Sequence, residues 1–263
     1  MNRILIAGTG RMGWWFVRLL RRDFQVAAYD KYPVNLPGPD ACACLTDREE
    51  IRSFNPDLLL NCVGIDSTVN AFNELSGYLS DSCVISDIAS LKENLHDYYL
   101  GSGRRFVSVH PMFGPTFASI DSLKGLNAII IEESDSEGKL FFRRLFNEAG
   151  IRIYETSFSE HDRLMSEALS LPLLATILFA SGLTGDIPAG TTYARHAAIA
   201  EGMYREEPEL LARLLLNRFS LEKIATLSEV LNRLRRLIEE KDPEGVRDLI
   251  GEGRERFSTK GLS

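Results

Sequence analysis

The chain has 263 residues, of which 44% are hydrophobic, 25% charged and 9% aromatic, and its formal net charge is −7. This composition is typical of a folded globular protein, so it excludes disordered chains, collagen-like chains and small disulfide-stapled scaffolds. The acidic balance also excludes a general nucleic-acid binder, which needs a net basic face.

The first part of the chain alternates short apolar runs with segments of helical length. The apolar runs predict buried strands at residues 4–7, 26–29, 58–60, 84–85, 106–109, 128–131 and 151–154. Helical periodicity predicts helices over residues 11–22 and near residues 139–149. Because fully apolar strands alternate with helices, we expect a parallel sheet covered on both faces, in an α/β domain over residues 1–157.

The pattern changes after Ser157, where no further strand is predicted. Helical periodicity predicts helices over residues 160–181, 207–217, 220–241 and 243–257. Pro243 suits the first turn of the last helix, because proline supplies no N–H and needs none there. We therefore expect an all-α domain over residues 158–263.

A glycine-rich motif links the first strand to the first helix, and its residues are Gly8, Thr9, Gly10, Arg11, Met12 and Gly13. In such a GxGxxG motif the first glycine makes a tight turn, the second admits a pyrophosphate and the third packs the helix close to the sheet. The helix N-terminus adds unpaired N–H groups and a partial positive charge. The motif therefore predicts a dinucleotide site in a Rossmann-like, doubly wound sheet.

An acidic residue supports this interpretation. Asp30 directly follows the second strand and lies twenty residues after Gly10 (30 − 10). A carboxylate there accepts hydrogen bonds from a ribose diol and repels a 2′-phosphate, which favours NAD as the cofactor. Lys31 could pair with such a phosphate, so NADP is not excluded.

Substrate groups are expected at the carboxyl ends of the parallel strands, where crevices form. Two segments leave strands with polar side chains: residues 84–92, which include Ser90 and Lys92, and residues 107–115, which include His110. An imidazole at a strand end, followed by Pro111, can accept a proton from a substrate hydroxyl. His110 is therefore the candidate catalytic residue.

The run His110-Pro111-Met112-Phe113-Gly114-Pro115 carries a family resemblance, together with Asp87-Ile88-Ala89-Ser90-Leu91-Lys92 and Glu160-His161-Asp162. These segments resemble the prephenate dehydrogenase family over essentially the whole chain. The resemblance implies a Rossmann-like domain followed by an all-α helical dimerisation domain. It also implies a homodimer that acts on a small-molecule substrate. A cytoplasmic location is expected separately, because the four cysteines fit free buried thiols in a reducing cytosol.

The reaction implied by the resemblance is the NAD-dependent oxidative decarboxylation of prephenate to 4-hydroxyphenylpyruvate in tyrosine biosynthesis. By the same resemblance His110 accepts the proton of the ring hydroxyl, and Ser90 orients that hydroxyl and the histidine. The segment Thr191-Thr192-Tyr193-Ala194-Arg195 resembles the family segment whose arginine binds a substrate carboxylate. A dianionic substrate in an acidic protein needs such a cation, and a guanidinium can bind it in bidentate fashion.

Two features depart from a simple transfer of the family pattern. Many relatives read like S-H-L-P-H before the long helix, whereas this chain has Leu169-Ser170-Leu171-Pro172-Leu173, so two of the polar positions are apolar here. The pair His161-Asp162 also matches a good helix start, because acids are favoured in a first turn. We therefore prefer a structural role for this pair.

Three alternatives stay open at this stage. An arogenate dehydrogenase would use the same mechanism, but the sequence does not place an acidic partner for the substrate amine. A β-hydroxyacid dehydrogenase also begins GxGxMG, but its lysine base and a reason for HPMFGP are both missing here. A regulatory module could bind NAD without turnover. The family is also sometimes fused to a chorismate mutase, so these residues could be part of such a fusion.

Compartment and assembly follow from the remaining residues. The longest apolar stretch, 168–183, is interrupted by Pro172 and shorter than the ~20 residues of a membrane span, so no membrane partner is expected. No signal peptide is predicted. Leucine-rich helices in the second half predict dimerisation. No metal site is predicted, because no CxxC pair occurs among Cys42, Cys44, Cys62 and Cys83.

Overall fold

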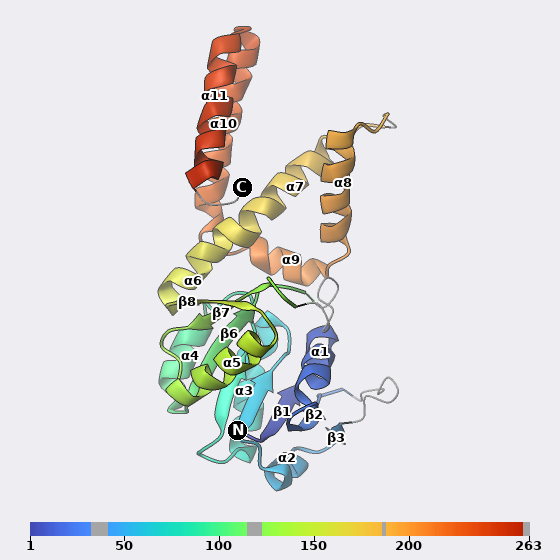
Figure 1. The fold of residues 1–263 in the computed structure, drawn as a ribbon, viewed down its shortest axis with the longest axis vertical. Helices are drawn as coiled ribbons and strands as arrows, with labels where there is room; N and C mark the ends of the chain where they lie inside the picture. Colours follow the sequence, from blue (N-terminus) through green and yellow to red (C-terminus); the bar gives the residue numbers. More distant parts are fainter. Residues whose placement is uncertain (33–41, 115–122, 186–187, 260–263) are drawn as a thin grey trace.

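The computed structural model describes residues 1–32, 42–114, 123–185 and 188–259. One eight-stranded sheet forms the lower part of the molecule in Figure 1, and its strands lie in the order β3-β2-β1-β4-β5-β6-β7-β8. The strands are β1 (Arg3–Ala7), β2 (Gln25–Tyr29), β3 (Ala43–Leu45), β4 (Leu58–Asn61), β5 (Val84–Asp87), β6 (Phe106–Pro111), β7 (Asn127–Ile131) and β8 (Arg152–Thr156). This is the doubly wound, Rossmann-like arrangement that the motif predicted.

The strand order reverses between β1 and β4, which are neighbours in space. In an open α/β sheet this switch point is where ligands bind, at the carboxyl ends of the strands. The Gly8–Gly13 motif follows β1 and therefore lies at this point.

The prediction of a fully parallel sheet is wrong at one position. The strands from β3 to β6 pair in parallel, but β7 runs antiparallel to β6, with His110 opposite Ile129. The apolar pattern could not show this. A strand that is buried on both faces is a continuous apolar run, and such a run has the same pattern whether the strand pairs in parallel or antiparallel.

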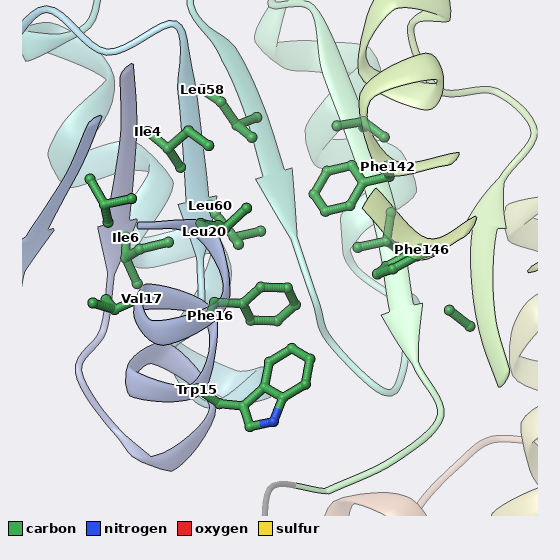
Figure 2. Packing of buried hydrophobic residues seen from close by; sticks show 14 of the residues in the cluster. Ile4, Ile6, Trp15, Phe16, Val17, Leu20, Leu58, Leu60, Phe142 and Phe146 are labelled. Carbon is green, nitrogen blue, oxygen red and sulfur yellow. The ribbon is translucent and has the colours of Figure 1, made fainter. Parts of the chain in front are cut away.

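Alternate residues of the strands pack into two separate cores. Ile4 and Ile6 point to the face covered by α1 (Arg11–Leu20) and α5 (Ser136–Glu148). Figure 2 shows this core, in which Trp15, Phe16 and Leu20 of α1 face the sheet and Phe142 and Phe146 come from α5. Burial of each such side chain stabilises this face by about 1.5–3 kcal/mol.

The opposite face of the sheet holds the second core. Leu5 and Leu59 belong to this face, and Phe72, Tyr99 and Phe158 pack there from three different helices. The covering elements are α2 (Arg48–Phe54), η1 (Ile65–Ser67), α3 (Thr68–Leu75), η2 (Ser76–Tyr78), α4 (Leu95–Ser102) and the start of α6 (Phe158–Met165). Both faces are therefore covered, as the apolar strands predicted.

The second part of the chain is helical in the residues described. It contains α6, a π-helical turn η3 (Ser166–Ser170), α7 (Leu171–Ser181), α8 (Thr191–Tyr204), α9 (Pro208–Leu215), α10 (Ser220–Glu239) and α11 (Pro243–Thr259). Figure 1 shows α10 and α11 as a hairpin that projects away from the sheet. The sequence did not single out α8 as a helix, because its apolar residues form no clear stripe.

The helix predicted over residues 160–181 is confirmed, and Pro172 lies within it. This proline lies at the first turn of α7, where its missing N–H is tolerated, and the helix runs unbroken from Phe158 to Ser181 over 24 residues. Its length and composition alone would allow it to cross a membrane, but one such helix is weak evidence. Phe158 and Met165 pack against the sheet, so its first turns belong to the protein core.

Candidate active site

The glycine loop at the switch point has the stereochemistry that a dinucleotide needs. Gly8 has a φ of +90°, and a Cβ there would lie 2.7 Å from Cγ1 of Val63. A Cβ on Gly13 would lie 1.9 Å from the carbonyl oxygen of Gly8, so this glycine lets α1 approach the loop. A Cβ on Gly10 would meet no atom within 4 Å. The open space over Gly10, at the start of a helix, fits a pyrophosphate.

Asp30 is linked directly to this loop. Its Oδ2 accepts hydrogen bonds from the backbone N–H of Thr9 at 2.7 Å and the hydroxyl of Thr9 at 2.8 Å, and its Oδ1 accepts one from Tyr32 N–H at 3.1 Å. Burial raises the pKa of Asp30, but these hydrogen bonds outweigh burial and hold the pKa below its usual value. The ionised carboxylate thus lies beside the loop at the end of β2.

A cleft of about 630 Å³ extends from the glycine loop toward the ends of β4 and β5. Ser90 lines it, as do Gly10, Arg11 and Met12 of the motif. Carboxylates of Glu206, Glu207 and Glu209, at the corner between α8 and α9, line its other side, and Glu206 lies 4.0 Å from Arg11. The helical part of the chain therefore supplies acidic groups to the nucleotide cleft.

His110 lies at the carboxyl end of β6 and is 3% exposed. Ser90 follows β5, the strand next to β6, so the two residues lie at the same edge of the sheet. No hydrogen bond joins Ser90 to His110, and Nε2 of His110 makes none to the described residues. Pro115, the last residue of the HPMFGP motif, lies outside the described residues.

His161 contacts the candidate catalytic residue, which the sequence did not predict. Nδ1 of His110 lies 3.2 Å from Nε2 of His161, and Nδ1 of His161 lies 2.8 Å from Oδ1 of Asp162. The only sequence signal was the adjacency of His161 and Asp162, which also fits a helix start. The contact depends on the packing of α6 against the sheet, so only the tertiary structure reveals it.

Lys92 is buried beneath the site rather than solvated. Its side chain is fully enclosed and makes an ion pair with Asp87, also fully enclosed, while Nζ donates to the carbonyl of Val109 at 2.8 Å. Its backbone N–H donates to Oδ1 of Asp162 at 2.8 Å. Lys92 thus connects the ends of β5 and β6 to α6 and fixes the loop that carries Ser90.

Burial keeps both histidines neutral near pH 7. It holds the pKa of His110 well below its usual value, and the nearby His161 and Lys92 lower that pKa further. Burial also lowers the pKa of His161, but the hydrogen bond to Asp162 opposes this effect. A neutral imidazole is the form that can accept a proton.

Arg195 lies on α8 and is exposed. It does not line the cleft, and it makes no ion pair with the described residues. Within one chain the structure therefore brings together the glycine loop, Asp30, Ser90 and His110 at one edge of the sheet, but not Arg195.

The fold and the site together define a protein with a Rossmann-like dinucleotide-binding domain and an appended helical region. The family model described as "Prephenate dehydrogenase, nucleotide-binding domain" matches residues 39–147, and two curated relatives align with 97% of the chain. The chain is thus similar to prephenate dehydrogenases, through the family model over residues 39–147 and through the curated relatives over nearly its whole length.

The relatives are similar at low identity. The T-protein of Haemophilus influenzae is 24% identical, and the "Probable arogenate/prephenate dehydrogenase" of Methanocaldococcus jannaschii is 22% identical. The chain spans 68% and 61% of the lengths of these two relatives. A crystal structure of prephenate dehydrogenase from A. aeolicus, in complex with hydroxyphenyl propionate and NAD+, has the same fold, with a TM-score of 0.81, 22% identity and 98% of each chain covered.

Proposed function

We propose that this chain catalyses the NAD-dependent oxidative decarboxylation of prephenate to 4-hydroxyphenylpyruvate in tyrosine biosynthesis. The observation that carries the proposal is His110, a buried neutral imidazole at the sheet edge that also holds the glycine loop. The similarity to prephenate dehydrogenases supports the reaction class.

The cofactor residues in this proposal are Gly8, Thr9, Gly10, Arg11, Met12, Gly13 and Asp30. The backbone of the loop holds the pyrophosphate, and Asp30 accepts hydrogen bonds from a ribose diol in place of those from Thr9. A nicotinamide held there would supply the acceptor for the hydride that leaves the substrate carbinol carbon.

The chain's own groups act on the substrate hydroxyl. Nε2 of His110 accepts its proton while Ser90 orients it from the neighbouring strand end. The surrounding burial excludes water, which strengthens these polar contacts. Loss of the ring carboxylate as carbon dioxide then gives the aromatic product.

Arg195 is proposed to bind a substrate carboxylate. Its exposure on α8 leaves the guanidinium available, because no carboxylate of the described residues pairs with it. Replacement by alanine is expected to raise the KM for prephenate more than it lowers kcat, since it removes binding rather than chemistry.

The proposal extends to the organisation of the protein. We place the dinucleotide-binding domain at residues 1–157 and the helical substrate and dimerisation domain at residues 158–263; Ser157 is the N-cap of α6 and accepts from Glu160 N–H. A homodimer is the proposed form, because the helices leave many apolar side chains uncovered. We also propose a cytoplasmic location.

Arogenate is the second candidate substrate, and one observation favours it. Glu206, Glu207 and Glu209 line the same cleft as Ser90, so a carboxylate is available for the ammonium group that arogenate carries and prephenate lacks. Glu206→Gln is then expected to weaken binding of arogenate but not of prephenate.

The experiment that tests the proposal combines the protein with NAD and each substrate and measures NADH together with the aromatic product. Turnover of prephenate that disappears in His110→Ala, with NAD binding intact, is the expected result. Turnover of arogenate alone would keep the mechanism and change the substrate. Tight NAD binding without turnover of either compound would identify a non-catalytic regulatory module instead.

A further inference from the structure

A line of three buried side chains extends from the candidate base into the protein. His110, His161 and Asp162 are 3%, 0% and 4% exposed. Nδ1 of His110 and Nε2 of His161 lie 3.2 Å apart, and Nδ1 of His161 and Oδ1 of Asp162 lie 2.8 Å apart. The line begins at the sheet edge and ends on α6.

The hydrogen positions along this line follow from the acceptor at its end. A carboxylate oxygen only accepts, and Oδ1 of Asp162 also accepts from Lys92 N–H at 2.8 Å. Nδ1 of His161 therefore carries a hydrogen, and in the neutral ring its Nε2 carries a lone pair. Nδ1 of His110 must then donate to that lone pair, which leaves Nε2 of His110 as an acceptor.

Asp162 is not needed as the cap of its helix. Ser157 already occupies the N-cap position and accepts from Glu160 N–H at 3.3 Å. The carboxylate of Asp162 is instead directed toward Lys92 and His161. A helix-start role therefore does not explain the pair.

We propose that His161 and Asp162 are positioning residues that form a proton relay with His110. They hold His110 in the tautomer whose Nε2 accepts the substrate proton, and His161 then receives a proton from Nδ1 of His110. The inference rests on the proposed function for its chemistry, and on the geometry alone for the tautomer.

Every bond that breaks in the proposed relay is matched by one that forms. The O–H bond of the substrate breaks, and its proton bonds to Nε2 of His110. The N–H bond at Nδ1 of His110 breaks, and that proton bonds to Nε2 of His161. The same carbinol carbon loses a hydride, for which a bound nicotinamide, the oxidant of the proposed function, would be the acceptor. The positive charge then lies on His161, in contact with the carboxylate of Asp162.

The surrounding charges favour His161 as the place for this proton. Burial, His161 and Lys92 all lower the pKa of His110. Burial and Lys92 also lower the pKa of His161, but Asp162 and Asp87 raise it. The carboxylates thus face the second histidine of the relay, where the charge is to be held.

The tautomers can be measured without substrate. The chain has four histidines, so their ring nitrogens can be assigned by ¹⁵N NMR near pH 7.5. We expect a protonated Nδ1 and an unprotonated Nε2 in both His110 and His161. A proton on Nε2 of His110 would overturn the relay whether or not the protein turns over any substrate.

The transfer step is tested by two variants that keep side-chain volume. His161→Gln can accept from His110 but cannot take up a proton, and Asp162→Asn keeps an oxygen acceptor but loses the charge. We expect kcat to fall about 10–100-fold in each, with KM changed less than about 3-fold, because the lost interaction develops during the reaction.

The pH profile separates the relay from a structural role. Asp162 raises the pKa of His161, so Asp162→Asn should move the acid limb of kcat to lower pH. Ser166→Ala is the control, because Ser166 is buried on the same helical stretch and donates only to the carbonyl of Arg163. Folded variants with wild-type kcat and pH profile would refute proton transfer. If the wild type turns over neither substrate, the proposed function fails, and the NMR result still decides the tautomers.

Discussion

At the scale of residues, the site rests on charges that are buried and paired. The carboxylate of Asp87 is fully enclosed; it accepts from the Lys92 ammonium and, at 2.7 Å, from the Tyr99 hydroxyl. Moving an ion from water into the protein interior costs several kcal/mol. A buried charge is therefore tolerated only when oppositely charged and hydrogen-bonding groups compensate for the lost water. The network therefore makes the floor of the site rigid and sensitive to the loss of any member.

Replacing Lys92 with methionine should be strongly destabilising. The variant leaves the Asp87 carboxylate buried without its cation, which costs about 3–5 kcal/mol of unfolding free energy. Urea denaturation measures the change. Lys31→Met is the matched control: Lys31 is exposed and lies 3.8 Å from an exposed glutamate, so its loss should cost less than about 1 kcal/mol. An equal loss of unfolding free energy in the two variants would show that the buried ion pair is no more important for stability than the exposed one.

The two buried histidines should make the fold sensitive to acid. Burial lowers the pKa of His110 and His161 in the native state, whereas the unfolded chain takes up protons near pH ~6.5. Stability is therefore complete above about pH 6.5 and falls below it, by up to about 1.4 kcal/mol per pH unit for each histidine.

Urea denaturation between about pH 7.5 and 5.5 measures this slope. His161→Gln should reduce it, and His196→Gln, on the exposed surface of α8, should leave it unchanged. A slope that does not change in His161→Gln would show that protonation of His161 is not what destabilises the fold.

At the scale of elements, the link between β1 and α1 shows two different uses of glycine. Gly13 lets the helix pack on the loop, since a Cβ there would overlap the Gly8 carbonyl oxygen. Gly10 has free space around it, so its lack of a side chain serves a ligand rather than the fold. Substitutions at Gly13 and at Gly10 should therefore affect stability and cofactor binding separately, although the two residues are only three positions apart.

Gly10→Ala and Gly13→Ala form a matched pair. Gly10→Ala should change the melting temperature little but weaken NAD binding, because its methyl group enters the space proposed for the pyrophosphate. Gly13→Ala should lower the melting temperature by at least several degrees, since one of the two backbones must move. Thermal unfolding and calorimetric titration with NAD measure the two effects. Unchanged NAD affinity in Gly10→Ala would remove the loop from the cofactor site.

The same elements show how far the sequence could predict the site. The motif and Asp30 lie within one β-α-β unit, so local spacing was sufficient to bring them together. His161 approaches His110 only because α6 packs on the sheet, and the glutamates at the corner between α8 and α9 reach the cleft from more than a hundred residues away. No local pattern encodes such contacts. Arg195 was assigned by resemblance, and its role stays a prediction.

At the scale of the whole molecule, the helical region has almost no core of its own. The described residues of α7 and α11 include no buried side chain, and α8 buries only Ala200. Ile224, Leu231 and Ile238 of α10 are 42%, 50% and 63% exposed and repeat every seven residues, so they lie on one face of the helix. A continuous apolar stripe of this kind favours a partner, and a second copy covers it symmetrically.

Sedimentation should therefore show a dimer at micromolar concentration. The double variant Leu231→Lys and Ile238→Lys places two charges on the stripe and should shift the protein to monomer. Arg235→Lys and Arg247→Lys, on exposed positions of the same hairpin, should leave the dimer intact. A wild-type protein that sediments as a monomer would contradict the dimer.

The sequence by itself determined what depends on local pattern. Apolar runs predicted every strand except the short edge strand β3, and helical periodicity predicted most helices, because each of these elements buries a face whose spacing is visible along the chain. The glycine motif predicted the nucleotide site for the same reason. Tertiary structure decided the antiparallel β7, the burial of Lys92 and the contact between His110 and His161. Each of these features depends on contacts between residues that are distant in the sequence. Such contacts are decided by the packing of whole elements against one another, which the pattern of a short segment does not reveal.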